Sequence, residues 1–215
     1  MAEALKQLSQ AVIDGDAAQA KTCAAAAVDA GVPANRVVGD GLLAGMSVVG
    51  TMFKANEMFV PEVLMSARAM HAGLDVLKPL LAAGGHGSFG KFVLGTVKGD
   101  LHDIGKNLVG MMLEGAGFEV VDLGIDVPPE KFVDAIREHR PEMVGLSALL
   151  TTTVPALEKT IKAIEESGLR PSVKVFTGGA VVNADLARKA GADYYAPDAA
   201  SAAELAAEVA RGKGR

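Results

Sequence analysis

The sequence predicts an α/β protein in which an N-terminal four-helix bundle precedes a flavodoxin-like (Rossmann-type) domain with a five-stranded parallel sheet. Apolar residues recur at helical spacing up to about residue 83. From Phe92 onward, short apolar runs typical of buried strands alternate with helical stretches five times. Strand–helix units that repeat in this way build a parallel sheet whose two faces are covered by helices.

The two patterns are separated by a glycine-rich segment. Residues 82–90 read Ala-Ala-Gly-Gly-His-Gly-Ser-Phe-Gly, and this concentration of glycine indicates a flexible connection. The sequence therefore predicts a helical bundle domain at 1–83, a linker at 84–90 and an α/β domain at 91–215.

Turn-forming residues separate four helices in the first domain. Asp16 follows a turn and is expected to cap the second helix, because an aspartate side chain accepts hydrogen bonds from the free N–H groups of a first helical turn. Gly31 and Pro33 mark the end of the second helix and the start of the third, and Pro61 suits the first position of the fourth. The predicted helices span residues 3–13, 16–30, 34–55 and 60–82.

The second domain is predicted to contain five consecutive strand–helix units. The strands are expected at 92–97, 118–124, 143–148, 173–178 and 192–196. The helices are expected at 105–116, 129–139, 154–167, 183–190 and 199–211. For five parallel strands the flavodoxin-like order 2-1-3-4-5 is favoured, and ligands of such sheets bind beyond the carboxyl ends of the first and third strands, where the order reverses.

The composition excludes several classes of protein. Half of the residues are hydrophobic and the net charge is −5, which favours a folded chain over a disordered one. No cluster of lysine and arginine dominates a face, so we expect no nucleic-acid partner. No apolar run approaches the ~20 residues that span a bilayer, and the N-terminus lacks the apolar core of a signal peptide. We therefore expect a cytoplasmic protein without a membrane partner. The single cysteine, Cys23, lies in an alanine-rich run and is expected to be a buried core residue.

The order of the strands selects two loops as the candidate binding site, residues 96–105 and 147–153. His102 is the only histidine in them, and a neutral imidazole can bind a transition metal. Asp100 lies two residues earlier, and metal-binding histidines usually donate their other N–H to a carboxylate. No second histidine, cysteine or carboxylate cluster completes a zinc-like set. A single protein ligand implies a metal that is already held by an organic macrocycle.

Each motif by itself also has a simpler explanation. The pattern Asp100-x-His102-x-x-Gly105 is also expected of a hydrogen-bonded loop histidine. Ser147-x-Leu149 and Gly178-Gly179 would each suit an ordinary strand–helix turn. What distinguishes this chain is that the three motifs occur in order, each at the carboxyl end of a predicted parallel strand.

In combination, these motifs resemble the cobalamin-binding domain of methionine synthase and the corrinoid proteins of methyltransferase systems, such as the methylamine, methanol and betaine corrinoid proteins. The resemblance implies that the chain binds cobalamin or a related corrinoid with its lower base displaced and with His102 as the axial cobalt ligand. Asp100 would be the hydrogen-bond partner of His102. Thr153, at a position where the family has serine, would be the third member of the proton relay.

The resemblance also implies which residues contact the cofactor. Ser147, Leu149 and the glycine pair would line the slot for the nucleotide tail. The full set expected in the α/β domain, beside Asp100, His102 and Thr153, is Leu101, Asp103, Ile104, Gly105, Ser147, Leu149, Thr151, Gly178 and Gly179.

The helical domain resembles the four-helix cap of the same proteins, which covers the upper, methyl-bearing face of the corrinoid. Met46, Val49 and Phe53 lie on one helical face, which is equally typical of bundle core. Phe59 and Val60 are the favoured lid residues. Together with the motifs above, the resemblance extends over nearly the whole chain.

By this resemblance the protein is a methyl carrier of one-carbon metabolism, in methanogenesis or acetogenesis, and not a catalyst on its own. A substrate-specific methyltransferase would load the methyl group from a methylamine, betaine, methanol or a methoxylated aromatic. An acceptor methyltransferase would deliver it to coenzyme M or tetrahydrofolate, and a reductive activase would rescue oxidised cobalt. When the lower ligand leaves, the Asp100–His102 pair would take up a proton.

Three alternative functions use a related fold. An adenosylcobalamin-dependent mutase subunit shares the Asp-x-His-x-x-Gly motif, and would be recognised by the alkyl form that it binds and by a barrel-shaped partner. A B12-sensing regulator can carry both domains, and normally adds a DNA-binding module. A receiver-like signalling domain would need an acceptor aspartate at the end of the third strand, where Ser147 stands.

Overall fold

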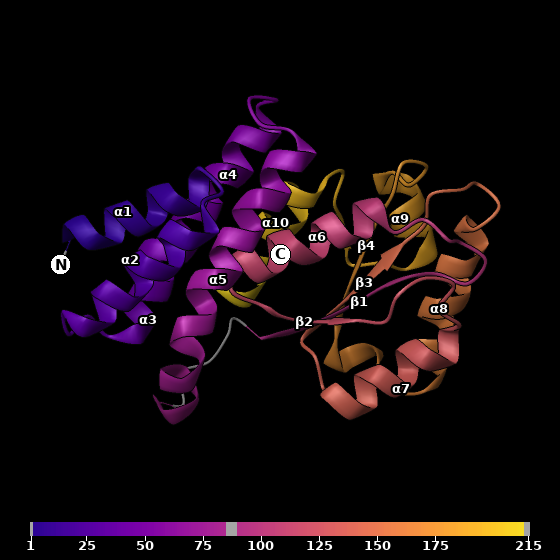
Figure 1. Ribbon diagram of the computed structural model, residues 1–215. Helices are drawn as coiled ribbons and strands as arrows, with labels where there is room; N and C mark the ends of the chain where they lie inside the picture. The colour runs from indigo at the N-terminus through magenta and orange to yellow at the C-terminus, as the bar shows by residue number, and fades with distance from the viewer. Residues whose placement is uncertain (1, 85–89, 213–215) are drawn as a thin grey trace. The chain divides into compact units, whose positions relative to one another are not determined.

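The computed structural model describes residues 2–84 and 90–212, and the chain forms two compact units (Figure 1). Among the described residues, the helical unit comprises 2–84 with 115–117, and the α/β unit comprises 90–114 with 118–212. Most of the linker predicted at 84–90 lies outside the described residues. Among those described, no helix combines the length and the apolar character needed to cross a membrane.

The helical unit consists of helices joined by short turns. They are α1 (Ala2–Ile13), α2 (Ala17–Asp29), α3 (Ala34–Val37), η1 (Val38–Leu43), α4 (Ala44–Lys54) and α5 (Val60–Gly84). Asp16 caps α2 as predicted, because its side chain accepts a hydrogen bond from the backbone N–H of Gln19 at 2.9 Å. Pro61 is the second residue of α5, not the first. Cys23 is buried, also as predicted.

The predicted third helix, 34–55, is one helical run with a π-helical turn in its middle, η1. Glycines bring this run close to α1. A Cβ at Gly41 would lie 2.7 Å from the side chain of Leu8, and one at Gly45 would lie 2.8 Å from the carbonyl oxygen of Ser9. π turns are rare and occur as single turns within α-helices, so a helical pattern alone does not predict one.

The α/β unit contains a five-stranded parallel sheet in the order β2-β1-β3-β4-β5, which confirms the predicted topology. The strands are β1 (Lys91–Thr96), β2 (Glu119–Asp122), β3 (Met143–Ser147), β4 (Lys174–Gly178) and β5 (Tyr194–Tyr195). The helices are α6 (Ile104–Gly115), α7 (Pro129–His139), α8 (Val154–Glu166), α9 (Ala184–Ala190) and α10 (Ala199–Ala210), with a short 3₁₀ turn, η2 (Arg170–Ser172).

Helices cover both faces of the sheet. Figure 1 shows α7 and α8 on one side of the sheet and α6 with α10 on the other. On the first face, Val93, Val144 and Val175 of the central strands pack with Phe132 of α7 and Leu157 of α8. Burial on both faces explains why the central strands are continuous apolar runs without alternation.

The central strands end level with one another. Thr96 of β1 pairs with Ser147 of β3, and Ser147 pairs with Gly178 of β4. An isolated parallel bridge between Val97 and Val127 extends the pairing beyond β2. The loops that follow β1, β2, β3 and β4 therefore leave the sheet at the same edge, which we call the carboxyl edge.

Candidate functional site

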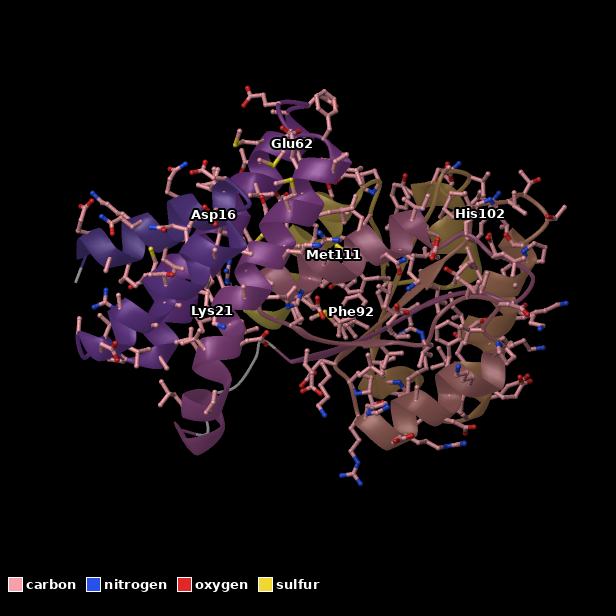
Figure 2. The ribbon with its side chains drawn as sticks, viewed as in Figure 1. Asp16, Lys21, Glu62, Phe92, His102 and Met111 are labelled. Carbon is pink, nitrogen blue, oxygen red and sulfur yellow. The ribbon has the colours of Figure 1, made fainter. Side chains whose placement is uncertain are left out.

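A histidine and a buried carboxylate form a pair in the loop after β1. His102 Nδ1 lies 2.7 Å from Asp100 Oδ1, and the backbone N–H of His102 donates to the same oxygen at 3.0 Å. Asp100 is fully buried, whereas half of the His102 side chain is exposed. Figure 2 shows His102 among the loops at one end of the sheet. The ring is thus fixed through one nitrogen and presents the other, Nε2, at the carboxyl edge.

The second oxygen of Asp100 joins this loop to the loop after β3. Asp100 Oδ2 accepts hydrogen bonds from the backbone N–H of Leu149 at 2.7 Å and from the buried hydroxyl of Thr153 at 2.8 Å. The Thr153 oxygen also accepts from the N–H of Leu150 at 3.3 Å. The structure therefore brings together Asp100, His102 and Thr153, the three residues that sequence analysis predicts as a relay.

These contacts keep the carboxylate of Asp100 ionised. Burial raises the pKa of Asp100, but the backbone N–H groups of Leu149 and His102, the His102 ring and the Thr153 hydroxyl outweigh burial and hold the pKa well below its usual value. A carboxylate can only accept a hydrogen bond, so His102 Nδ1 carries a proton. In the neutral ring this leaves the lone pair on Nε2, which is the tautomer that a metal ligand requires.

The surroundings of His102 suit a metal within a large apolar ligand better than a bare metal ion. Among residues 2–84 and 90–212 there is no group of three or more histidine, cysteine, aspartate or glutamate side chains that could hold a metal. Large apolar side chains are instead exposed at the carboxyl edge: Leu101, Ile125 and Leu150 in the loops, and Ile104 at the start of α6. Exposed apolar side chains at the sheet edge that carries the imidazole indicate a surface that a broad ligand covers.

The predicted glycine pair is needed by the fold itself. Gly179 has φ +125°, and a Cβ on it would lie 1.9 Å from the carbonyl oxygen of Ala148. A Cβ on Gly178 would lie 2.9 Å from the carbonyl oxygen of Ala196. Beside them, the Thr177 hydroxyl is buried and has no hydrogen-bond partner among the described residues. Such an orphaned polar atom fits a site where a ligand supplies the missing partner.

The remaining predicted residues of the α/β unit lie in the same loops or in the strand and helix ends that border them. Ser147, the last residue of β3, is half-buried, and Thr151 is exposed in the following turn. The carboxylate of Asp103 accepts a hydrogen bond from the Asn107 side chain at 3.2 Å, and its carbonyl accepts from the Asn107 N–H at 2.7 Å. Gly105 is exposed in the first turn of α6.

The predicted residues of the helical unit differ in exposure. Met46 and Val49 are buried, Phe53 and Val60 are half-buried, and Phe59 is one of the most exposed large apolar residues that the structure describes. The apolar face of α4 therefore behaves as core at two of its three predicted positions. A role for these residues over a metal stays a prediction.

Sequence analysis missed the loop after β2. Asp126 Oδ1 accepts from the backbone N–H of Gly99 at 2.8 Å, and its Oδ2 lies 2.9 Å from Lys98 Nζ. The N–H of Asp126 donates to the carbonyl of Asp100 at 3.0 Å. The predicted strand order places β2 beside β1, so that their loops share an edge, but it does not mark Asp126 within its loop. Ile125 and Leu150, at the same edge, were missed as well.

Comparison with known proteins agrees with this geometry. A B12 binding domain family matches residues 90–206, and a second B12 binding domain family matches residues 4–78. A corrinoid protein of Desulfitobacterium hafniense (strain Y51) is 44% identical over 208 residues, which are 95% of this chain and 96% of that protein. Dimethylamine corrinoid protein 2 of Methanosarcina acetivorans is 42% identical over 212 residues, 98% of each chain.

A solved structure is similar as well. A chain in the crystal structure of the methanol:cobalamin methyltransferase complex MtaBC from Methanosarcina barkeri matches with a TM-score of 0.87 and 32% identity. The match covers 98% of this chain and 80% of that one. Similarity of sequence and of structure along almost the entire chain shows that this protein belongs to the B12-binding corrinoid proteins of methyltransferase systems.

Proposed function

We propose that this protein binds cobalamin or a related corrinoid and carries a methyl group between two methyltransferases. The single observation that carries this proposal is the Asp100–His102 pair, with Nδ1 bound to a buried carboxylate and Nε2 presented at the carboxyl edge. When bound, the corrinoid supplies the cobalt that accepts and releases the methyl group. His102 Nε2 would be the lower axial ligand, so the corrinoid's own lower base would be displaced.

The residues of the site would hold a proton when the axial bond is not made. Nε2 then becomes free, and it can be protonated while Nδ1 stays bound to Asp100. The ionised carboxylate stabilises the resulting imidazolium through the Nδ1–H hydrogen bond. Thr153 and the Leu149 N–H keep Asp100 ionised throughout. The pair thereby couples ligation to proton uptake at a defined atom.

The displaced nucleotide tail would enter beside β3 and β4. Ser147, Leu149, Gly178 and Gly179 are proposed to line its slot, and the unpartnered hydroxyl of Thr177 offers it a hydrogen bond. The exposed apolar side chains near His102 would contact the underside of the macrocycle. In the helical unit, Phe59 and Val60 are proposed to cover the opposite face.

The partners are proposed from the names of the relatives. These include dimethylamine corrinoid proteins and a subunit of a methanol:cobalamin methyltransferase complex. A methyltransferase for a methylated amine or methanol is therefore the first donor partner to test, followed by those for betaine and methoxylated aromatics. Coenzyme M and tetrahydrofolate are the candidate acceptors, and a reductive activase would restore oxidised cobalt. Similarity to corrinoid proteins along the whole chain supports a carrier over a mutase subunit or a B12 sensor.

The test identifies the nitrogen that binds cobalt. The full chain is produced with ¹⁵N-labelled histidine, loaded with hydroxocobalamin and reduced to the cobalt(II) state. If His102 is the ligand, the nitrogen splitting in the electron paramagnetic resonance spectrum changes from a triplet to a doublet on labelling. His102→Ala should abolish this change, whereas His139→Ala, at the end of α7, should retain it. A triplet that persists in the labelled protein would contradict the proposal.

A further inference from the structure

We infer that Asp126 is a positioning residue for the cobalt ligand: it fixes the backbone on both sides of Asp100 and thereby sets the orientation of Asp100 and His102. This inference rests on the proposed role of His102. It concerns the loop after β2, which contributes no member of the Asp100–His102–Thr153 set.

Asp126 contacts three consecutive residues of the histidine loop. Its carboxylate accepts from the N–H of Gly99 at 2.8 Å and pairs with Lys98 Nζ at 2.9 Å. Its own N–H donates to the carbonyl of Asp100 at 3.0 Å. The first hydrogen bond fixes the peptide unit that precedes Gly99, and the second fixes the peptide unit that follows Asp100. The backbone between them, from which the Asp100 side chain projects, is held at both ends.

This support matters because a glycine stands in the turn, where the Asp100 N–H also donates to the carbonyl of Val97 at 3.1 Å. Gly99 has φ +85°, a conformation that glycine enters and leaves easily. Asp126 itself has φ +52°, which aspartate and asparagine tolerate better than most residues. Without the carboxylate, the Gly99 N–H loses its protein acceptor and the peptide before it is free to rotate. A rotation there would move Asp100, and with it the Nδ1 partner that orients the His102 ring.

The backbone hydrogen bond should matter more than the ion pair. The Lys98 and Asp126 side chains are 57% and 40% exposed, and ion pairs at such positions are screened by water. The Gly99 N–H and then the Lys98 ammonium hold the pKa of Asp126 below its usual value, so the acceptor is ionised at neutral pH. Removing the Lys98 ammonium should therefore have little effect on the conformation of the histidine loop, whereas removing the Asp126 carboxylate should alter it.

The loop that carries Asp126 is itself anchored to the start of α6. The side chain of Lys106 is buried, pairs with Asp122 and donates to Asn107 Oδ1 at 2.6 Å. The other oxygen of Asp122 accepts from the N–H of Gly124 at 2.9 Å. These contacts fix the first residues of the loop, and Asp126 is therefore held in position.

The variants distinguish the contributions of the Asp126 carboxylate, of its ion pair and of its backbone conformation. Asp126→Gly removes the side chain and keeps the positive φ accessible. Asp126→Asn keeps an oxygen acceptor for the Gly99 N–H. Lys98→Met removes only the ion pair, and Asp134→Asn changes an exposed carboxylate on α7 as the matched control.

Each full-length variant is titrated with hydroxocobalamin, and the histidine-ligated fraction is measured from the cobalt(II) spectrum with ¹⁵N-histidine. We expect Asp126→Gly to bind about tenfold more weakly, the equivalent of one charge-assisted hydrogen bond, and to show a smaller histidine-ligated fraction. In Asp126→Asn, the affinity and the histidine-ligated fraction should lie within about threefold of the wild-type values. In Lys98→Met and Asp134→Asn, they should lie within about twofold of those values. Hydrogen exchange of the Gly99 amide in the corrinoid-free chain should be about tenfold faster in Asp126→Gly alone.

Two results would overturn the inference. One is an Asp126→Gly chain whose affinity and histidine-ligated fraction equal those of the wild type. The other is a loss of thermal stability in Asp126→Gly with an unchanged histidine-ligated fraction, because that pattern belongs to a purely structural residue. Failure of the proposed function looks different, since wild type and His102→Ala would then give the same spectra. The Gly99 exchange rate remains decisive in that case, because it needs no cofactor.

Discussion

At the scale of single residues, the site depends on a charge that is kept out of water. Asp100 is fully buried, and an ionised carboxylate in that position is costly unless it is hydrogen-bonded. Two backbone N–H groups, one ring N–H and one hydroxyl meet this need. The same hydrogen bonds that stabilise the charge also fix the direction of His102, so stability and ligand geometry have a common origin.

Asp100→Asn should make the free energy of unfolding of the corrinoid-free protein less dependent on pH in the acidic range. The folded-state pKa of Asp100 lies below its unfolded value of about 4, so its stabilising contribution is present above pH 4 and is lost as the pH falls through the folded-state pKa. We expect the variant to be less stable by about 2 kcal/mol at pH 7, with a difference that shrinks below about pH 4. Urea unfolding at a series of pH values measures this difference.

The control for that experiment is Asp134→Asn, which alters an exposed aspartate on α7. Its stability should follow the wild type at every pH to within about 0.5 kcal/mol. A gap between wild type and Asp100→Asn that stays constant from neutral to acid pH would mean that Asp100 is not the ionised group described above.

Thr153 should matter through its hydroxyl alone. Thr153→Val keeps the shape but leaves Asp100 Oδ2 with the Leu149 N–H as its remaining donor in the site. The expected loss is about 1–2 kcal/mol of unfolding free energy at pH 7. Thr153→Ser, which retains the hydroxyl, should lose much less. Chemical denaturation of the two variants side by side is the measurement, and equal losses would refute a role for the hydroxyl.

Sequence reasoning reached these residues unevenly. His102 and Asp100 could be selected because their loop follows the first strand at the reversal of strand order, and Thr153 because of family resemblance. Asp126 could not be selected by that rule, because its loop follows β2, which is not at the reversal. Its importance comes from hydrogen bonds to backbone atoms of Gly99 and Asp100, and no residue pattern in the sequence marks a backbone partner.

At the scale of secondary-structure elements, the site is built by strands that end together and by loops that approach one another closely. The closest approach is at Gly179, where the loop after β4 passes the carbonyl of Ala148 after β3. Glycine is required there twice, for its positive φ and for its missing side chain. Gly179 thus lets the chain after β4 approach Ala148 closely, and Gly178 does the same for Ala196 after β5.

Gly179→Ala should destabilise the protein by about 3 kcal/mol or more, because the new Cβ would overlap the Ala148 carbonyl and the backbone would be strained. Gly168→Ala is the matched control, since Gly168 has φ +76° with no neighbouring atom within 4 Å of an added Cβ. That variant should lose only about 1–2 kcal/mol. Guanidinium unfolding of both variants separates steric overlap from backbone strain, and equal losses would contradict the steric explanation.

The types and order of the elements were predictable, and their lengths less so. The apolar runs predicted all five strands and the topology, because both faces of the sheet are buried. The outer strands are shorter than predicted: β2 spans Glu119–Asp122 and β5 only Tyr194–Tyr195. Each has a partner on one side only, so pairing ends before the apolar pattern does. The π turn in η1 lies in a run that packs closely on α1 at Gly41 and Gly45, and no residue pattern in the sequence marks it.

At the scale of the whole molecule, the chain combines a helical unit with an α/β unit, and the proposed carrier role assigns them different tasks. The α/β unit would hold the lower side of the corrinoid. The helical unit would cover the reactive side of the corrinoid and would move to expose it when a partner enzyme binds. Phe59 is the residue that best separates this shielding from folding, because its side chain is largely exposed.

Phe59→Ala should leave the free energy of unfolding nearly unchanged, within about 0.5 kcal/mol, because little apolar surface is lost from the core. If Phe59 covers the reactive side of the cofactor, the loaded variant should lose its methyl group to buffer faster than the wild type. Absorption spectroscopy of the methylated protein over time measures this rate. Val63→Ala, a fully buried position on α5, is the contrasting variant and should mainly lower stability. Identical methyl lifetimes in Phe59→Ala and wild type would exclude Phe59 as a shield.

The location of the Asp126 loop has a consequence for how readily the site can be altered. It is carried by β2, an outermost strand of the sheet with β1 as its only neighbour in the ladder. Peripheral strands accept substitutions more readily than central ones, since fewer contacts depend on them. Substitutions in β2 and its loop are therefore expected to change how firmly the imidazole is held, and to leave the histidine motif itself untouched.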